Sequence, residues 1–440
     1  MATLQSMYQT ACANMPGGVN SSVRLNQAIG APLYIKHSEG SRVWDIEGRE
    51  FIDMCCGHGA GLLGYKHAAV VEAVQTAIDM GFAGSFETIW QQNLAAKIAK
   101  SIPSAQMMRF VSSGSEATLH LIRACRGYTG RSKIIRFEGH FHGYHELIYC
   151  GGNPPADYLK ANREKPYVES AGILDEYSKF IIPIPFNDEK AVTDAVETHG
   201  KDIALMILEP VNYNCACIMP KPGYLNFLRK ICDESGILLF FDEIQSCFKK
   251  SIGGAQVDFD VIPDVCTIGK ALGGGLPLSA FCGKKQIMDV IKPVGPVQHS
   301  GTFNATLIPI LAGNAFMDTA EKPDFYPRLQ KLEKQFHEGI DTIIKTHDFN
   351  MIVPNHGARF AIVFGRKTPA QRYEDTFSHD KNVMLSFISK CFKKGVYFHD
   401  YGGGASHHGY SIQHDSEDIN ACLNVIESSL IEMRKDGLAI

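Results

Sequence analysis

The stretch Asp264-Val-Cys-Thr-Ile-Gly-Lys-Ala-Leu-Gly-Gly-Gly-Leu-Pro277 is an apolar strand that ends at a lysine and then opens into three consecutive glycines. A lysine at the end of a buried strand loses solvation, which lowers its pKa and makes the neutral amine available as a nucleophile. The glycines let the backbone pass close to a bound cofactor because they carry no Cβ. A phosphate-binding P-loop is excluded, since that motif needs a glycine at the position of Asp264. We therefore expect Lys270 to be a Schiff-base lysine.

A second apolar strand, Gly236-Ile-Leu-Leu-Phe-Phe-Asp-Glu-Ile244, ends in two carboxylates. Such a continuous apolar run is typical of a strand buried on both faces of a parallel sheet. Ligands of open α/β sheets bind outside the carboxyl ends of the strands, so we expect Asp242 and Lys270 to face one ligand. Alone, Asp242 would be interpreted as a turn acid or a helix N-cap. Together the two residues match pyridoxal phosphate (PLP), which needs a lysine for its aldehyde and a carboxylate for its ring nitrogen.

The run Met108-Arg-Phe-Val-Ser-Ser-Gly-Ser-Glu-Ala-Thr118 predicts a short strand, a turn of small residues and the start of a helix. The free N–H groups and the positive dipole end of a helix N-terminus bind anions, and the Ser115 hydroxyl adds a donor. An ordinary capped helix start is the alternative. Phe141 follows another predicted strand, and it is placed either to stack on a planar ring or to fill the core.

The chain resembles the class III, fold type I PLP aminotransferases in the order and spacing of six motifs: Ser112-Ser-Gly-Ser-Glu-Ala117, Phe137-Glu-Gly-His-Phe-His-Gly143, Glu209-Pro-Val211, Phe241-Asp-Glu-Ile244, Thr267-Ile-Gly-Lys-Ala-Leu-Gly-Gly-Gly-Leu-Pro277 and Gly301-Thr302. Within that class, Met15-Pro-Gly-Gly-Val-Asn-Ser-Ser-Val-Arg24 and Gly253-Gly-Ala-Gln256 resemble glutamate-1-semialdehyde 2,1-aminomutase and its relatives that transaminate β-amino acids or arylglycines. So many ordered motifs leave little room for coincidence.

The resemblance implies a role for each matching residue. Lys270 holds the cofactor and moves a proton, and Asp242 pairs with the pyridine nitrogen. Thr302 reaches the phosphate of a neighbouring subunit, so we expect a homodimer. The expected cofactor-binding residues are Ser113, Gly114, Ser115, Phe141, His142, Glu209, Asp242, Ile244, Gln245, Lys270 and Thr302. The expected substrate-binding residues are Arg24, which matches the carboxylate-binding arginine of the family, Ser21 and His58.

Departures from the aminomutase pattern bear on the substrate. His58 stands where that pattern has a tryptophan, and Tyr401-Gly-Gly-Gly-Ala-Ser-His-His-Gly409 lacks the glutamate that faces the aminomutase substrate. Gly301-Thr-Phe-Asn-Ala305 is closer to β-amino acid aminotransferases. We therefore expect a PLP-dependent aminotransferase that moves an amino group between a carboxylate-bearing amine and a carbonyl acceptor. The alternative is an intramolecular aminomutase with the same residues. A pseudoenzyme would have a broken Lys270 or Asp242, and both are present.

Three further patterns are weak. Gly59-Ala-Gly-Leu-Leu-Gly64 has the spacing of a dinucleotide fingerprint, but no clear βαβ unit surrounds it. The histidines at 140, 142 and 145 lack accompanying metal ligands, and Cys215 and Cys217 lack a second pair, so we expect no metal.

Composition is that of a soluble globular enzyme, with 45% hydrophobic and 20% charged residues in 440. The net charge of -4 gives no electrostatic case for nucleic acid or an anionic membrane. The 13 cysteines lie mainly in apolar contexts, and residues 1–8 lack a signal-peptide pattern, so we expect a cytoplasmic protein.

Alternating strands and helices predict an α/β fold with a mainly parallel sheet covered by helices. We expect an N-terminal arm with a small hairpin over residues 1–60, packing with the C-terminal domain, and a large PLP-binding domain over 61–315. A small α+β domain follows over 316–440, and a long helical stretch runs from 304 to 346 across the boundary. The polar, proline-rich segment 151–166 is expected to be a mobile active-site lid.

Overall fold

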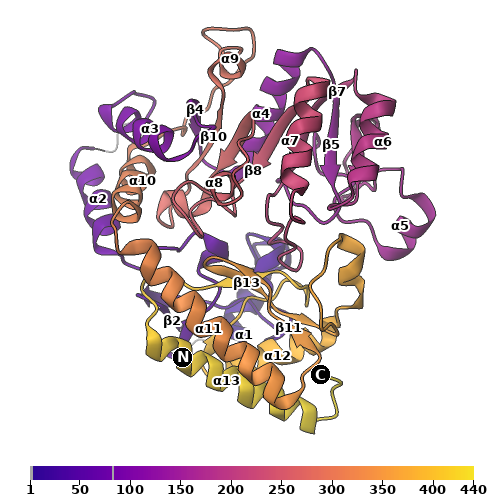
Figure 1. The fold of residues 1–440 in the computed structure, drawn as a ribbon. Helices are drawn as coiled ribbons and strands as arrows, with labels where there is room; N and C mark the ends of the chain where they lie inside the picture. Colours follow the sequence, from indigo (N-terminus) through magenta and orange to yellow (C-terminus); the bar gives the residue numbers. More distant parts are fainter. Residues whose placement is uncertain (1–2, 82–83) are drawn as a thin grey trace.

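The computed structural model describes residues 3–81 and 84–440, and its largest feature is a seven-stranded sheet (Figure 1). The strand order is β4-β10-β9-β8-β7-β5-β6. β10 runs antiparallel to both neighbours, and the other neighbouring pairs are parallel. The strands are β4 (Met107–Val111), β5 (Lys133–Phe137), β6 (Ile181–Ile184), β7 (Ile203–Leu208), β8 (Leu238–Asp242), β9 (Val265–Ile268) and β10 (Ser279–Gly283). The expected mainly parallel α/β sheet is confirmed.

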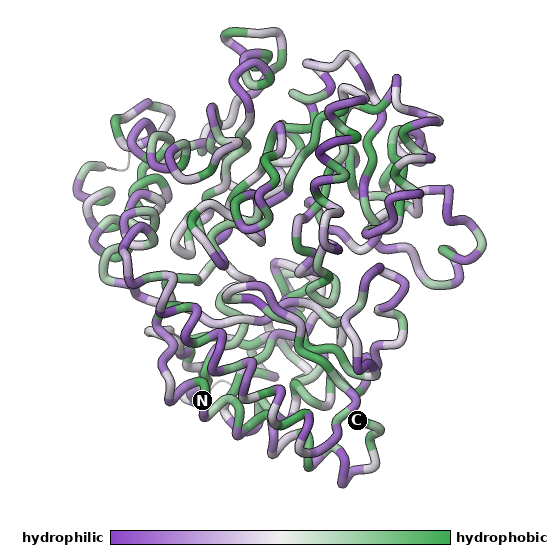
Figure 2. The backbone as a smooth tube through the Cα atoms, viewed as in Figure 1, coloured by the Kyte–Doolittle hydropathy of each residue, from purple (hydrophilic) through white to green (hydrophobic). Residues whose placement is uncertain are grey.

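Strand β7 shows why the sheet is covered on both faces. All its residues are buried, and alternate side chains point to opposite faces. Leu205 and Ile207 join the apolar cluster that includes helix α4 (Gly114–Thr129), whereas Met206 and Leu208 join the cluster that includes α6 (Glu189–His199) and α7 (Tyr224–Ser235). Figure 2 shows the strands of this sheet as hydrophobic stretches of the chain.

The other helices in this part of the chain are α2 (Ala68–Asp79), α3 (Ile89–Ser101), α5 (Ala156–Asn162), α8 (Ala255–Asp258), α9 (Lys285–Met288) and α10 (Leu307–Ala320). The short 3₁₀ helices are η1 (Pro16–Gly18), η2 (Ser22–Arg24), η3 (Gly57–Gly59), η4 (Asp175–Phe180), η5 (Lys270–Gly273) and η6 (Tyr373–Ser378). Among the described residues, no helix is both long and apolar enough to cross a membrane.

The C-terminal third of the chain combines long helices with short strands. Its helices are α11 (Phe325–His347), α12 (Lys381–Lys393) and α13 (Ser416–Lys435). Its strands form a two-stranded sheet of β11 (Met351–Ile352) and β14 (Val363–Phe364) and a three-stranded sheet of β12 (Asn355–His356), β13 (Arg359–Ala361) and β16 (His407–Gly409).

The N-terminal segment lies against this C-terminal part (Figure 1). After helix α1 (Leu4–Cys12), the strands β1 (Ile35–Glu39), β2 (Arg42–Asp45) and β3 (Glu50–Asp53) form a sheet with β15 (Val396–Tyr397). β15 pairs with β3 in parallel, so residues far apart in sequence form one sheet. The expected boundary between the large and the small domain, at residue 315, falls inside α10. The division of the chain into three parts stays a prediction.

Candidate active site

Asp242 and Lys270 lie at the carboxyl ends of neighbouring parallel strands. Asp242 is the last residue of β8 and pairs in register with Thr267 of β9, and Lys270 follows β9 as the first residue of η5. Both residues line one cavity of about 280 Å³, which we call the inner cavity. Its lining residues are Ala60, Ser112, Ser113, Gly114, Ser115, Phe141, His142, Gly143, Glu209, Asn214, Asp242, Ile244, Gln245, Lys270, Leu276, Pro277, Leu278 and Ser279. The sheet therefore brings together the carboxylate and the amine, as expected from the two strand ends.

Hydrogen bonds fix the buried Asp242 carboxylate on both of its oxygens. Oδ2 lies 2.8 Å from Nδ1 of His142, and Oδ1 accepts from the Thr267 hydroxyl at 2.8 Å and from the backbone N–H of Ile244 at 3.2 Å. Burial lowers the pKa of His142, although its bond to Asp242 opposes the shift. His142 is therefore a neutral imidazole that donates its Nδ1 proton to Asp242.

Lys270 has a backbone φ of +47°, in the left-handed region that a residue with a side chain rarely adopts. Its side chain is half-buried, and burial lowers the pKa of its amine to about 8, while the nearby Glu209 carboxylate opposes that shift. Burial likewise raises the pKa of Glu209 to about 8. Near neutral pH the neutral, nucleophilic amine is thus a far larger fraction of Lys270 than of an ordinary lysine.

The N-terminus of helix α4 forms one end of the inner cavity. Ser113 is the N-cap, and its hydroxyl accepts from the Glu116 backbone and donates to the Glu116 carboxylate at 2.9 Å. The Ser115 hydroxyl accepts from the Tyr144 backbone at 3.2 Å. Backbone N–H groups at the start of such a helix attract an anion. The arrangement suits a phosphate, with Gly114 at the start of the helix.

Apolar side chains and an unpaired amide form the rest of the inner cavity. Phe141 and Ile244 both line it, and the Phe141 backbone donates to Glu209 at 2.8 Å. Gln245 is buried, and neither Oε1 nor Nε2 of its amide has a partner among the described residues. A buried polar group without a partner is costly, so the free Gln245 amide suits a ligand in this cavity.

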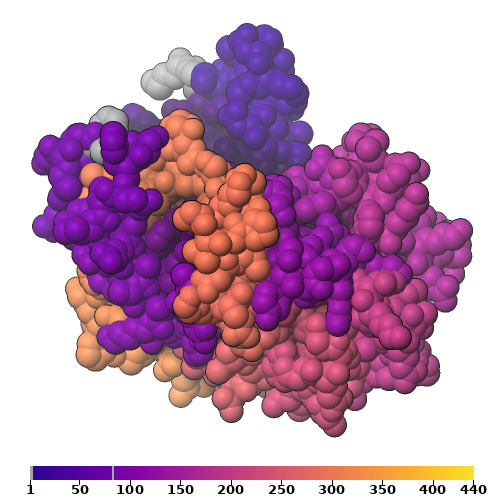
Figure 3. All heavy atoms as spheres, turned by 90° about the horizontal axis from the view of Figure 1, so that it is seen from above, coloured from indigo at the N-terminus to yellow at the C-terminus, as the bar shows by residue number. Residues whose placement is uncertain are grey.

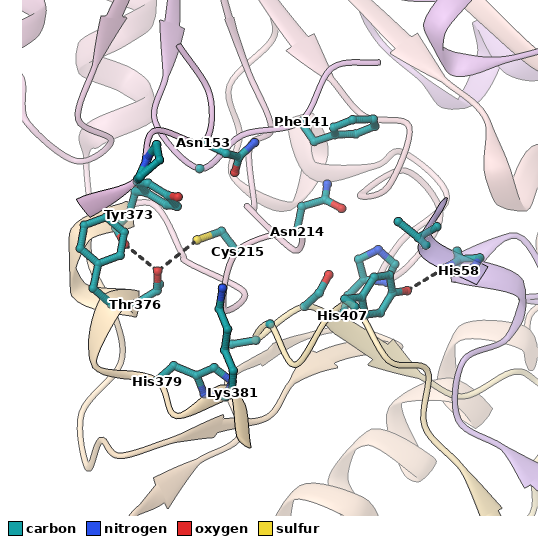
Figure 4. Close-up of a pocket in the computed structure, with 18 of the residues that line it drawn as sticks. His58, Phe141, Asn153, Asn214, Cys215, Tyr373, Thr376, His379, Lys381 and His407 are labelled. Carbon is teal, nitrogen blue, oxygen red and sulfur yellow. Dashed lines mark hydrogen bonds between the residues drawn. The ribbon is translucent and has the colours of Figure 1, made fainter. Parts of the chain in front are cut away.

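A larger cavity of about 820 Å³, the outer cavity, adjoins the inner one (Figure 4). Lys270, Phe141 and Asn214 line both cavities. The other lining residues come from several parts of the chain: Val23, His58, Gly139, Tyr144, Asn153, Pro155, Ala156, Cys215, Tyr373, Thr376, Phe377, His379, Lys381, Tyr401, Gly404, Ala405, Ser406 and His407. The outer cavity therefore gives a second molecule access to the Lys270 amine.

Of the three expected substrate-binding residues, the structure brings His58 alone into the outer cavity. Arg24 is exposed and lines another cavity of about 310 Å³, which His58 also lines. Ser21 lines neither of the two cavities that Lys270 lines. Thr302 is also exposed, and it lines a separate cavity of about 860 Å³ with residues 85–88, 91–92 and 108–110.

Sequence reasoning missed several residues of the outer cavity, including Asn214, Lys381, Tyr401 and His407. None of these four residues directly follows a long apolar strand, and none belongs to a motif at the start of a predicted helix. Tyr401 and His407 lie in the segment 401–409, which lacks the substrate-facing glutamate of the aminomutase pattern. The sequence alone does not indicate which residue takes the place of that glutamate. Only the tertiary pairing of β13 with β16 brings His407 to the site.

The histidines of the segment 140–145 have protein partners. Nδ1 of His140 accepts from the Glu209 backbone at 2.9 Å, and Nε2 of His145 lies 3.0 Å from the Thr118 hydroxyl. Elsewhere, Cys55, His58 and His399 bring ligand atoms within 4.8 Å of one another. Both His399 nitrogens already bond to protein, to the Tyr397 hydroxyl and the Val23 carbonyl, so this group carries no metal assignment.

Comparisons with known proteins agree with this geometry. Residues 26–430 match the family model described as aminotransferase class-III. The chain is 35% identical over 434 residues to a glutamate-1-semialdehyde 2,1-aminomutase of Methanobrevibacter smithii, covering 98% of this chain and 99% of the relative. An omega-transaminase from Sphaerobacter thermophilus superposes with a TM-score of 0.90 at 25% identity, covering 98% of both chains. A solved transaminase with PLP bound gives a TM-score of 0.88 at 25% identity over 99% of both chains.

Proposed function

This chain belongs to the class III aminotransferase family, and we propose that it moves an amino group from a carboxylate-bearing amine, such as a β-amino acid, to a keto acid or another carbonyl acceptor. It is a PLP-dependent aminotransferase. One observation carries the proposal: Lys270 lies between an inner cavity that holds Asp242 and an outer cavity that is open to a second molecule.

The residues of the inner cavity fit PLP. The N-terminus of α4, with Gly114 and Ser115, suits the phosphate, and the Asp242 carboxylate suits a protonated ring nitrogen. Phe141 and Ile244 offer apolar surfaces for a planar ring. The unpaired amide of Gln245 offers a donor and an acceptor to the same ligand.

In the proposed mechanism, each residue performs a task that its surroundings favour. Bound PLP supplies an electron sink for negative charge that develops on the substrate carbon. Lys270 Nζ would hold the cofactor aldehyde, and as a free amine Nζ would accept the proton from the substrate carbon that carries the amine. The Asp242 carboxylate would stabilise a proton on the ring nitrogen, because hydrogen bonds from His142, Thr267 and the Ile244 backbone hold it in place.

We also propose that the enzyme is a cytoplasmic homodimer. Thr302 lies outside the inner cavity of its own chain, on an exposed segment, which supports a role in a neighbouring subunit. Beside it, Phe303 and Phe86 are 73% and 71% exposed. Figure 3 shows the segment around residues 290–310, in orange, against residues 85–130, in violet. All cysteines are free thiols and only Cys12 is exposed, which suits a reducing compartment.

The proposed activity is tested in two ways: by following amino transfer from a donor, and by labelling the lysine that carries the cofactor. The enzyme with PLP is given 3-aminobutanoate and 2-oxoglutarate, and glutamate formation is followed. Borohydride reduction and peptide mapping then locate the cofactor. We expect glutamate to form and the label to lie on Lys270, and Lys270→Ala to abolish both. A label on another lysine contradicts the assignment of Lys270.

The second candidate function is intramolecular amino transfer, which the 35% identity to an aminomutase favours. The same residues would serve it. Conversion of glutamate-1-semialdehyde to 5-aminolevulinate without any added acceptor, faster than transamination of 3-aminobutanoate, would replace the first proposal with this one.

A further inference from the structure

Arg359 is a buried guanidinium with no carboxylate in an ion pair among residues 3–81 and 84–440. It is 1% exposed, and it donates to the carbonyls of Cys55 at 3.0 Å and His407 at 3.1 Å. Its Nε has no partner within the same described ranges. A guanidinium stays protonated in proteins, and a buried charge is costly unless an opposite charge accompanies it. Arg359 therefore has no directly bonded counter-ion, although its charge acts on the buried Asp53 carboxylate and opposes the rise in pKa that burial causes there.

This positive charge lies close to the reactive lysine. Burial is the main cause that lowers the pKa of Lys270, and the charge of Arg359 lowers it further. Aspartate and glutamate are absent from the lining residues of the outer cavity, which include Lys270 and Lys381. The outer cavity is thus electrostatically suited to an anionic group of the substrate.

His407 connects Arg359 to the outer cavity. Arg359 on β13 donates to Nδ1 of His407 on the adjacent strand β16, and His407 lines the outer cavity (Figure 4). Because Nδ1 accepts this bond, the ring proton of a neutral His407 is on Nε2. Nε2 of His407 has no acceptor in the described part of the chain. Both ring nitrogens of His408 are fully buried without a partner, whereas Nε2 of His407 is not fully buried. The cavity therefore contains an N–H donor of fixed tautomer.

Tyr401 packs against the His407 ring in this wall of the cavity, and His58 in turn holds Tyr401. The ring centroids of Tyr401 and His407 are 5.3 Å apart, and the Tyr401 hydroxyl lies 2.8 Å from Nδ1 of His58. His407 and His58 are both neutral, because burial lowers the pKa of each well below its ordinary value. A carboxylate in the outer cavity would thus accept a neutral N–H bond that Arg359 polarises from behind.

We propose that His407, positioned by Arg359, binds the carboxylate of the substrate through its Nε2–H. This rests on the proposed aminotransferase function and deepens it. It gives the His407–Arg359 pair the task that the family resemblance gives to Arg24, which is exposed and lines a different cavity. The bound carboxylate would add a negative charge on the cavity side of the Arg359–His407 pair.

The test compares two amines in the same enzyme variants. 3-Aminobutanoate carries the carboxylate, and propan-2-amine is the corresponding amine without it. The measured quantity is the ratio of kcat/KM for the two amines with PLP-loaded enzyme. Loss of a charge-assisted hydrogen bond is expected to lower this ratio about tenfold or more in His407→Leu. His407→Gln keeps an N–H donor at this place and should retain more of the ratio than His407→Leu.

Arg359 is tested as a positioning residue. Arg359→Met should raise the KM for 3-aminobutanoate more than it lowers kcat, and Arg359→Lys, which keeps the charge and a donor, should restore part of the loss. A second readout is the thermal midpoint of the loaded enzyme with 3-hydroxybutanoate, which has the carboxylate but no amine. The wild-type midpoint should rise with this ligand, and that rise should be lost in His407→Leu and Arg359→Met.

His37→Leu is the matched control, because His37 is exposed on β1 and lines neither the inner cavity nor the outer cavity. An unchanged ratio in His407→Leu, or a fall in Arg24→Ala but not in His407→Leu, overturns the inference. So does a wild-type enzyme that uses both amines equally well. A wild-type enzyme that converts neither amine and carries no cofactor on Lys270 contradicts the proposed function itself. If Arg359→Met does not fold, the two His407 variants decide.

Discussion

Nδ1 of His142 lies 2.8 Å from Oδ2 of Asp242, so a buried imidazole ties the loop after β5 to the end of β8. The second oxygen of Asp242 accepts from Thr267 on β9. Side chains from the loop after β5 and from β9 thus fix the carboxylate at the end of β8 in the inner cavity. Since burial keeps His142 neutral, the imidazole brings no positive charge that would compete with a ligand for the Asp242 carboxylate.

Asp242→Asn should therefore lower kcat while leaving the fold in place. Asparagine has nearly the same shape and still accepts from Thr267, but it carries no charge to stabilise a protonated ring nitrogen. Loss of one preorganised electrostatic group costs about 10²–10³-fold in kcat. Stopped-flow single turnovers with 3-aminobutanoate measure the effect, and borohydride labelling checks that Lys270 still captures PLP. Asp79→Asn, at an exposed position near the end of α2, is the control. A kcat that stays near the wild-type value argues against an electrostatic role.

The pH dependence of Lys270 gives the second prediction. Its pKa is lowered from 10.5 to about 8, so the neutral amine becomes dominant as pH rises through about 8. The rate at which apoenzyme captures added PLP should therefore rise with pH and level off above that value. Glu209 raises the pKa of Lys270, so Glu209→Gln should move the midpoint to lower pH. A midpoint near 10.5 in the wild type would rule out a desolvated lysine.

Gly143→Ala tests the close packing at the phosphate end of the inner cavity. Gly143 has φ of +103°, and an added Cβ would lie 2.7 Å from the Ser115 hydroxyl. Gly172 has φ of +90° with open space around its Cβ position, so Gly172→Ala introduces the backbone strain without the collision. We expect each change to destabilise the fold by about 1–3 kcal/mol in urea unfolding, and Gly143→Ala alone to weaken PLP binding. Equal PLP affinities in the two variants would remove the packing argument.

The sequence predicts the parts of the site that local patterns determine. Long apolar runs predict β8 and β9, and parallel strand ends meet at one edge, so Asp242 and Lys270 follow directly. The helix at Gly114 follows from its cap and its apolar face. These features depend on neighbours in sequence and on one general rule of sheet topology.

The rest of the fold and of the site depends on pairing between residues far apart in sequence, or on a single residue that ends a helix. The expected helical stretch from 304 to 346 is two helices, α10 and α11, and Pro323 lies in the interruption because it cannot continue a helix. β16 has three residues, and it reaches the site by pairing with β13, about fifty residues earlier. Neither a period nor a motif marks His407 or Arg359. Arg24, which a motif does mark, lies on a different cavity.

Assembly provides the last prediction. Phe303 and Phe86 are exposed near Thr302, and large exposed apolar groups on one face mark an interface. Phe303→Asp places a charge there and should shift the protein towards monomer in sedimentation velocity. If Thr302 serves the partner's phosphate, the monomer should also bind PLP more weakly, and Thr302→Val should weaken PLP binding while the dimer persists. Leu174→Asp, at a residue that is 60% exposed next to η4, is the control and should change neither. A monomer of Phe303→Asp with wild-type PLP affinity and activity would separate catalysis from assembly and contradict a composite site.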